Sequence, residues 1–176
     1  HPVAVAIELG PEGPSLPRAS GLPDEVFETD GQITKRPMRA LALCALAPRP
    51  GERLWDLGAG SGSIAIEWLL SALSTQAVAV EARPDRAARI RRNADALGVD
   101  RLEVVEGETP AALADLPPPD AVFIGGGLCA DLLTVLEAIS PAPRLGAHAV
   151  TLESEAVLAE AQARLGGDLL RIELAA

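Results

Sequence analysis

A glycine-rich turn between an apolar strand and a helix-forming run limits what this chain can fold into more than any other feature. The segment reads Leu54-Trp-Asp-Leu-Gly-Ala-Gly-Ser-Gly-Ser-Ile-Ala-Ile-Glu67. Glycine adopts positive φ without steric cost and lets a ligand approach bare backbone, so the pattern favours a nucleotide-binding turn. Its G-x-G-x-G spacing differs from the G-x-G-x-x-G of dinucleotide-binding folds and lacks the Gly-Lys-Ser/Thr of a phosphate loop. A tight turn without a ligand is the alternative.

After an initial helix at residues 35–47, apolar strands alternate with amphipathic helices. This order predicts an α/β fold with a doubly wound, mostly parallel sheet. The predicted strands cover residues 53–57, 76–81, 102–105, 120–124, 147–152 and 169–173. The other predicted helices cover residues 63–73, 84–97, 110–116, 130–139 and 154–165. Ligands in such sheets bind outside the carboxyl ends of the strands.

The first residues differ in composition from the rest. Residues 1–23 contain five prolines, three glycines and one strand-like run at residues 3–9. We therefore expect residues 1–20 to form a linker or an edge segment and residues 21–176 to form one domain. Thr34 is the predicted N-cap of the first helix, because Pro37 follows in its first turn.

Composition and charge narrow the function classes. The formal net charge is −10 and only 2% of the residues are aromatic, which argues against generic nucleic-acid binding. Cys44 and Cys129 do not have metal-ligand spacing, and we expect both to be buried in a reducing compartment. No stretch is long and apolar enough to span a bilayer, and no signal peptide is visible, so we expect a cytoplasmic, soluble protein.

The glycine turn resembles motif I of the class I S-adenosylmethionine (SAM) methyltransferases, which have a Rossmann-like fold. In this reading Glu81, which ends the second strand, accepts the ribose hydroxyls; a solvated helix-capping acid is the alternative. Asp56 contacts the cofactor or only pins the glycine turn, and Glu108 or Thr109 bonds the adenine amine. The candidate cofactor-binding residues are Thr34, Asp56, Gly58, Ala59, Gly60, Ser61, Gly62, Glu81, Ala82, Gly107, Glu108, Thr109 and Gly125.

The loop Gly125-Gly-Gly127 bears on the kind of methyl acceptor. Backbone passes close to the methyl donor and the substrate at this position, although a flexible loop without a ligand is nearly as good a reading. Nucleic-acid amino-methyltransferases have a D/N-P-P-Y type motif here, and this chain does not. It also lacks the metal triad of the catechol type, so no metal is expected. Methylation of carbon or carboxylate fits better.

Three stretches point to a narrower family. Gly21-Leu-Pro-Asp-Glu-Val-Phe27, Ile33-Thr-Lys-Arg-Pro-Met-Arg39 and the glycine-turn block resemble the decarboxylating half of the precorrin-6Y carbon-5,15-methyltransferases of the cobalamin pathway. The resemblance implies methylation at the carbon-15 meso position of a tetrapyrrole and loss of carbon dioxide from the ring C acetate. It also implies fusion behind another methyltransferase in the larger enzymes, and tetramers among free-standing relatives.

The methyltransferase fold normally has a seventh strand, and after a sixth strand at 169–173 none is expected before Ala176. An incomplete sheet exposes an apolar edge, so we expect something else to cover it.

An acidic protein that binds a polycarboxylate needs a local positive patch. Lys35, Arg36 and Arg39 lie within about one helical turn and are the candidate substrate-binding cations, with Gly126 and Gly127 beside the substrate. A solvated helix terminus is an equal alternative for the cations. His148 is interpreted as structural, and no catalytic residue is assigned, because an electron-rich pyrrolic carbon is its own nucleophile.

Two other functions stay open at this point. Transfer RNA and isoaspartyl methyltransferases also have a segment like Ile33-Thr-Lys35 ahead of motif I, although the acidity weakens the RNA version. A non-catalytic domain that binds SAM or organises a biosynthetic complex is the other alternative.

Overall fold

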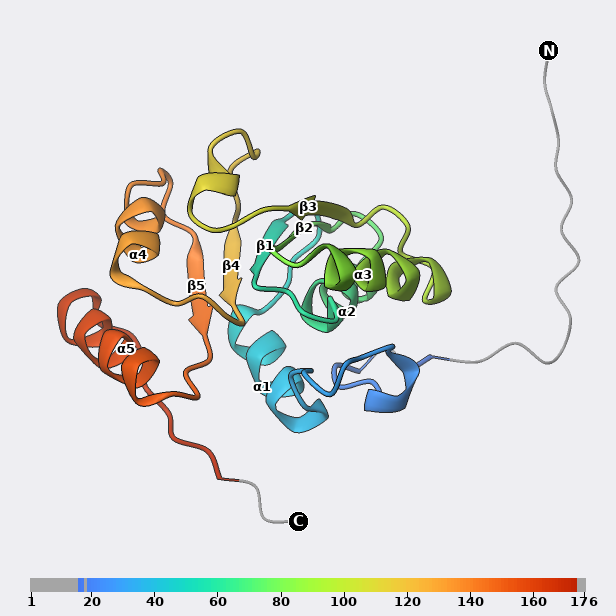
Figure 1. The fold of residues 1–176 in the computed structure, drawn as a ribbon, viewed down its shortest axis with the longest axis horizontal. Helices are drawn as coiled ribbons and strands as arrows, with labels where there is room; N and C mark the ends of the chain where they lie inside the picture. Colours follow the sequence, from blue (N-terminus) through green and yellow to red (C-terminus); the bar gives the residue numbers. More distant parts are fainter. Residues whose placement is uncertain (1–15, 18, 174–176) are drawn as a thin grey trace, which may run out of the picture.

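A computed structural model describes residues 16–17 and 19–173, and within them five strands form one parallel sheet of order β3-β2-β1-β4-β5. The strands are β1 (Arg53–Leu57), β2 (Gln76–Glu81), β3 (Glu103–Glu106), β4 (Ala121–Ile124) and β5 (Arg144–Ala147). Every neighbouring pair is parallel. Helices therefore connect the strands and cover both faces, as the doubly wound prediction requires (Figure 1).

The helices divide into two layers around the sheet. They are α1 (Arg36–Leu46), α2 (Ser63–Ser71), α3 (Pro84–Ala96), α4 (Ala130–Glu137) and α5 (Leu152–Leu165), with short 3-10 helices η1 (Asp24–Val26) and η2 (Ala111–Leu113). The first core cluster joins α1, α2 and α3 to one face of the sheet, and the second joins η2, α4 and α5 to the other face.

Side chains that alternate along β1 separate the two cores. Leu54 belongs to the cluster with α1, α2 and α3, whereas Trp55 and Leu57 belong to the cluster with α4 and α5. All three are buried, which explains why this strand reads as an apolar run rather than as an apolar–polar alternation. Trp68 on α2, also fully buried, fills the first cluster.

Backbone hydrogen bonds continue past the strand ends and align the loops that follow. The Gly58 amide donates to the Val80 carbonyl (2.9 Å), and the Gly125 amide donates to the Leu57 carbonyl (2.8 Å). The His148 amide donates to the Ile124 carbonyl (3.1 Å). Because β1 pairs with both β2 and β4, the loops after these strands meet at the point where the strand order reverses.

The structure corrects several expectations about the elements. The fifth strand covers residues 144–147 rather than 147–152, and residues 169–173 form no strand. The expected helix at 110–116 is only the 3-10 turn η2. Lys35, not Thr34, is the N-cap of α1, and its side chain makes no capping bond. The expected run at residues 3–9 lies outside the described residues.

The cysteine expectation was also wrong, because Cys44 and Cys129 are both exposed free thiols. Within the described residues, no helix has the length and apolar character needed to cross a bilayer.

Candidate functional site

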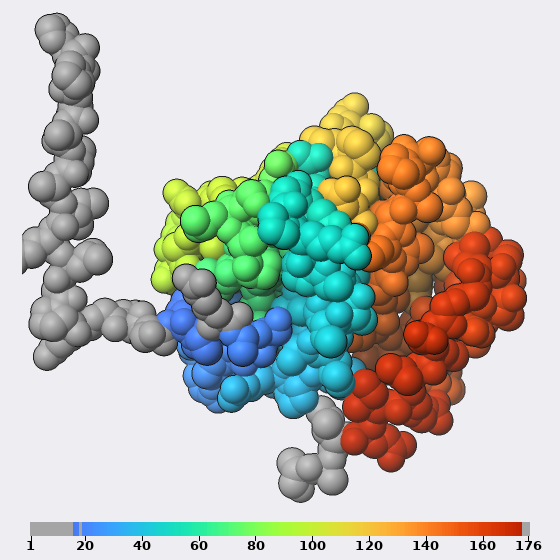
Figure 2. All heavy atoms as spheres, turned by 180° about the vertical axis from the view of Figure 1, so that it is seen from behind, coloured from blue at the N-terminus to red at the C-terminus, as the bar shows by residue number. Residues whose placement is uncertain are grey.

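A large cleft of about 1500 Å³ lies at the carboxyl ends of the strands. Its walls come from the segment before α1, the turn after β1, the ends of β2, β3 and β4, the residues after β5, and α5 with the segment beyond it. Figure 2 shows the hollow between α1 (cyan) and the C-terminal part of the chain (red). This is the position where α/β sheets bind their ligands.

Most of the predicted site residues line this cleft. Those that do so are Thr34, Lys35, Asp56, Gly58, Ala59, Gly60, Ser61, Glu81, Ala82, Gly107, Glu108, Thr109, Gly125, Gly126 and Gly127. Gly62, Arg36 and Arg39 are not among the lining residues. Fifteen predicted positions that are scattered over the sequence from residue 34 to residue 127 are thus brought to one surface.

Two glycine loops touch each other backbone to backbone. Gly58 has φ +67°, and a Cβ atom there would lie 2.8 Å from the nitrogen and the oxygen of Gly126. A side chain at Gly58 would therefore push the turn after β1 away from the loop after β4. Gly62 serves helix packing instead, because a Cβ there would lie 2.7 Å from Cγ2 of Ile90 and would keep α2 from packing on α3.

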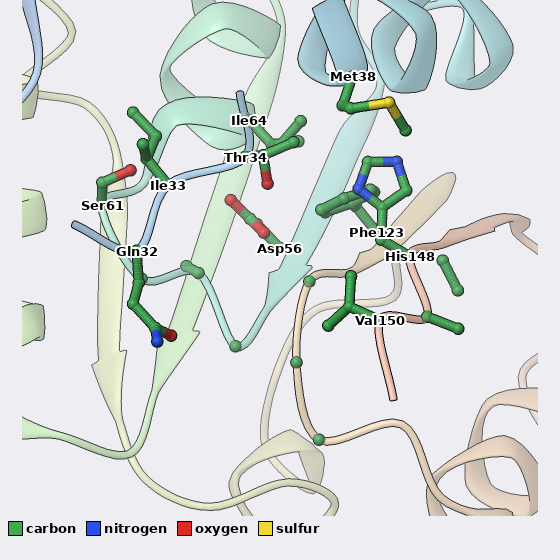
Figure 3. Close-up of a pocket in the computed structure, with 18 of the residues that line it drawn as sticks. Gln32, Ile33, Thr34, Met38, Asp56, Ser61, Ile64, Phe123, His148 and Val150 are labelled. Carbon is green, nitrogen blue, oxygen red and sulfur yellow. The ribbon is translucent and has the colours of Figure 1, made fainter. Parts of the chain in front are cut away.

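Asp56 forms an acidic floor of the cleft. Its Oδ2 accepts a hydrogen bond from the Ala65 amide (3.1 Å), and the residue is 1% exposed. Burial raises the pKa of Asp56 to about 7; the Ala65 hydrogen bond lowers it, and the nearby charge of Glu81 raises it further. The carboxyl group therefore pins the glycine turn and also faces the cavity (Figure 3).

Glu81 is held by the two backbone segments beside it. Its Oε2 accepts from the Gly60 amide (2.9 Å) and its Oε1 accepts from the Arg83 amide (3.0 Å). Each carboxylate oxygen has a second lone pair, so the group remains able to accept a ligand hydroxyl. This geometry fixes an acceptor at the end of β2.

Residues 31–35 form one wall of the cleft, and the segment that leads into them is held to α3 by hydrogen bonds and an ion pair. Asn93 accepts from the Glu28 amide (2.8 Å) and donates to the carbonyls of Glu28 (3.0 Å) and Ser61 (2.9 Å). Asp30 pairs with Arg86 (2.9 Å), and the Arg86 hydrogen bond lowers the pKa of Asp30 to about 2. Sequence analysis did not predict these contacts, because the partners lie more than 30 residues apart.

The expectation that Arg39 binds substrate was wrong. Its side chain is fully buried, and its Nε donates to Glu67 (2.5 Å). The guanidinium also donates to Asp24 (2.9 Å) and to the carbonyls of Thr34 and Leu22. A guanidinium with its donors committed inside the protein is not available to a ligand carboxylate.

The other two candidate cations differ in position. Lys35 lines the cleft with an exposed side chain, and its Nζ lies 4.0 Å from Asp24. Arg36 is exposed but outside the cleft. Of the three predicted cations, only Lys35 is therefore placed to meet a ligand.

His148 lies in the cleft, although the sequence reading gave it a structural role. It follows β5, and its ring packs edge-to-face on Phe123 with centroids 5.0 Å apart (Figure 3). Burial lowers the pKa of this imidazole. The sequence signal existed, since His148 is the only internal histidine, but the misplaced fifth strand concealed it.

Several apolar lining residues were also missed. Ile33, Met38, Phe123 and Val150 enclose the cleft beside Asp56 (Figure 3).

The predicted residue Ser61 contributes a buried Oγ that has no hydrogen-bond partner among the described residues. An unpaired buried hydroxyl that faces a cavity is a vacant contact for a polar ligand. Among the described residues, no group of three metal-ligating side chains is close enough to hold a metal ion.

The sheet order, the glycine turn after β1 and the acid at the end of β2 define a Rossmann-like methyltransferase fold, which solved methyltransferases of about 20% identity share. The chain belongs to the precorrin methyltransferase domain family, whose model matches residues 25–176.

Similar proteins agree with this family. A precorrin-6Y C(5,15)-methyltransferase (decarboxylating) from Sinorhizobium sp is 56% identical over 99% of this chain, which spans only 44% of that relative. A probable cobalt-precorrin-6B C(15)-methyltransferase (decarboxylating) from Pyrobaculum calidifontis is 37% identical, with 84% of this chain and 79% of the relative covered. The crystal structure of the C-terminal domain of precorrin-6Y C5,15-methyltransferase from Rhodobacter capsulatus has a TM-score of 0.86 at 52% identity, covering 90% of this chain and 86% of that domain.

Proposed function

We propose that this chain methylates carbon 15 of a precorrin with SAM as methyl donor and removes carbon dioxide from the ring C acetate, as a step of cobalamin biosynthesis. The observation that carries the proposal is the pattern of coverage. The chain matches 44% of a relative named for carbons 5 and 15, but 79% of a smaller relative named for carbon 15 and decarboxylation. The matched part therefore corresponds to the carbon-15 activity.

The cleft residues fit SAM. The ligand is a cation at its sulfonium and amino groups, and Asp56 and Glu81 place acidic groups along one side of the cleft. Glu81 would accept the ribose hydroxyls, and Glu108 or Thr109 would bond the adenine amine. Thr34, Asp56 and the unpaired Ser61 hydroxyl would hold the amino-acid end. When bound, SAM supplies an electrophilic methyl group.

The protein's own contribution is placement and exclusion of water. The glycine loops at Gly58 and Gly126 let a ligand approach bare backbone, while Met38, Phe123 and Val150 supply apolar walls. A pyrrolic meso carbon brings its own nucleophilic electron pair, so a fixed position relative to the methyl group provides most of the acceleration. The conjugated macrocycle can accept the electron pair that decarboxylation releases.

We also propose that copies of the chain associate. Val150, Leu152 and Leu170 are 90%, 81% and 78% exposed, and they follow the edge strand β5. A second copy that covers this edge of the sheet would remove these side chains from water. A tetramer and a cytoplasmic location stay predictions from the sequence.

Calorimetric titration with S-adenosylhomocysteine, followed by a precorrin that retains its acetate, tests the proposed function. We expect binding of the first ligand and a second binding event for the tetrapyrrole. Lys35→Ala should weaken tetrapyrrole binding about 3- to 5-fold, the range for one exposed ion pair. Arg36→Ala is the matched control and should leave it unchanged, because Arg36 lies outside the cleft.

Two results would contradict the proposal in different ways. Binding of S-adenosylhomocysteine without any response to the tetrapyrrole would point to another methyl acceptor. No binding of S-adenosylhomocysteine would exclude a methyltransferase activity for this chain.

A further inference from the structure

We propose that the His148 imidazole carries a proton between the two halves of the reaction, taking the proton that methylation releases and returning it to the carbon that loses carbon dioxide. The inference rests on the proposed function and adds to it a catalytic residue and a reason why one cleft performs both steps.

Two contacts fix the position of His148 in the cleft. Its amide donates to the Ile124 carbonyl (3.1 Å), which holds its backbone at the carboxyl end of the sheet beside β4. Its ring meets the Phe123 ring at 89° with centroids 5.0 Å apart. The side chain lines the same cleft as Asp56 and the glycine turn. Figure 3 shows the imidazole between Phe123 and Met38, beside Val150.

Phe123 links His148 to the loop where we expect the methyl acceptor. The Phe123 Cε1 atom would lie 3.2 Å from a Cβ atom on Gly125, so the ring packs directly under the loop Gly125–Gly127. The adjoining Gly126 touches Gly58 of the cofactor turn. The imidazole is therefore one aromatic ring away from the meeting point of the two glycine loops.

The ring nitrogens of His148 are available for proton transfer. Neither has a hydrogen-bond partner among the described residues, whereas backbone amides hold the carboxyl groups of Asp56 and Glu81 in place. Burial lowers the pKa of this imidazole and so favours its neutral form, whose unprotonated nitrogen can accept a proton. His148 is the only histidine among the described residues.

The proton balance of the two steps explains why such a group is needed. When a methyl group from a sulfonium replaces the hydrogen of a meso carbon, a carbon–carbon bond forms, the sulfur keeps the pair of the broken bond, and one proton is released. When an acetate loses carbon dioxide, its carbon–carbon bond breaks and the remaining carbon must take up one proton to become a methyl group. One proton released and one proton consumed leave no net change, so a single neutral base serves both steps.

The experiment compares His148→Gln and His148→Ala with the unaltered chain in single-turnover assays that follow methyl transfer and carbon dioxide release separately. We expect both rates to fall at least about 100-fold in each variant, within the range for loss of a general acid–base group. Affinity for S-adenosylhomocysteine should stay within about 2-fold. Added imidazole should restore at least about 10-fold of the lost activity in His148→Ala, because the deleted side chain leaves space for it.

A readout without turnover accompanies these rates. The chain has two histidines, His1 and His148. In NMR spectra, the signals of the carbon-bound ring protons of His148 are therefore those that disappear in the His148→Gln variant. We expect these signals to move when the tetrapyrrole is added. Leu73→Ala, at a side chain that is exposed and outside the cleft lining, is the control for substitution as such, and it should retain both rates within about 3-fold.

Four results would overturn the proposal. They are rates within 3-fold of the unaltered chain in His148→Gln, a fall in only one of the two rates, loss of cofactor affinity in parallel with the rates, and lack of rescue by imidazole. A chain that neither binds S-adenosylhomocysteine nor turns over before any substitution would instead refute the proposed function itself.

Discussion

Arg39 places a guanidinium inside the first core cluster, where two carboxylates and two carbonyl groups surround it. Its carbon atom Cζ also lies 4.9 Å from the centre of the Phe27 ring. Removing a charge from water is costly, and only partners with good geometry compensate for it. The Arg39 contact to the Thr34 carbonyl reaches the cleft wall, so Arg39 supports the site from behind without touching a ligand.

We predict that Arg39→Met lowers the free energy of unfolding by about 3–5 kcal/mol, because Glu67 is then left buried without its cation. Urea denaturation followed by circular dichroism measures this change. Arg36→Met, three residues away and exposed, is the control and should stay within about 0.5 kcal/mol. A loss below about 1 kcal/mol for Arg39→Met would show that water or another group compensates Glu67.

At the scale of elements, the contact between the turn after β1 and the loop after β4 determines the shape of the cleft. We predict that Gly58→Ala costs at least about 2 kcal/mol, because the new Cβ would meet Gly126 backbone and the residue would keep a left-handed conformation. Affinity for S-adenosylhomocysteine should fall at least about 10-fold, as calorimetry would measure.

Gly126→Ala offers a matched control for Gly58→Ala on the other side of the contact. Its Cβ would have no non-neighbouring atom closer than 3.9 Å, and its φ lies outside the left-handed region. We expect a change below about 1 kcal/mol. Equal effects of the two substitutions would mean that the loops move apart freely, contrary to the packing.

The same scale explains which elements the sequence could predict. The bounds of β1 and β2 were predicted without error, because buried parallel strands read as continuous apolar runs between glycine-rich or polar turns. The predicted start of β5, at residue 147, lay three residues after its observed start at Arg144. This edge strand begins at Arg144, whose charge suggests a loop, whereas in the fold its guanidinium donates to Glu52 and to the Leu46 carbonyl.

Residues 169–173 show the opposite error. Their apolar–polar pattern predicts a strand, but they lie in the cleft wall without a sheet partner among the described residues.

The wrong bounds of the fifth strand also affected the interpretation of the site. They placed His148 inside a strand, where a structural role is expected, instead of just beyond one. Arg39 was misread because its partner Glu67 lies 28 positions away, and such pairing leaves no local pattern.

At the scale of the whole molecule, two kinds of carboxyl group change the stability in opposite directions as the pH rises. Glu28, Glu52 and Glu137 each accept a hydrogen bond from an arginine that lowers their pKa, as Arg86 does for Asp30. Their stabilisation is present above their unfolded pKa values near 4 and is lost as the pH falls below them. Asp56, whose pKa burial raises to about 7, destabilises the fold progressively as the pH rises from about 4 to 7.

We therefore predict greatest stability at about pH 4, a decline between about pH 4 and 7, and little further change toward pH 8. Asp56→Asn keeps an oxygen acceptor for the Ala65 amide but cannot ionise. It should raise the free energy of unfolding at pH 8 by up to about 4 kcal/mol and change it little at pH 4. Denaturant melts at both pH values test this, with Asp85→Asn on the exposed surface as the control. An equal effect at both pH values would show that Asp56 does not titrate in this interval.

The carboxylate of Glu67 accepts from the Gly21 amide (2.6 Å) and the Leu22 amide (3.0 Å) as well as from Arg39. The backbone ahead of η1 is therefore part of the same ionic centre that supports the cleft wall. A protein engineer who moves this catalytic unit onto another scaffold has to splice upstream of Gly21. A junction placed at the first strand, where the sheet begins, would leave a buried negative charge unmatched and the cleft without one of its sides.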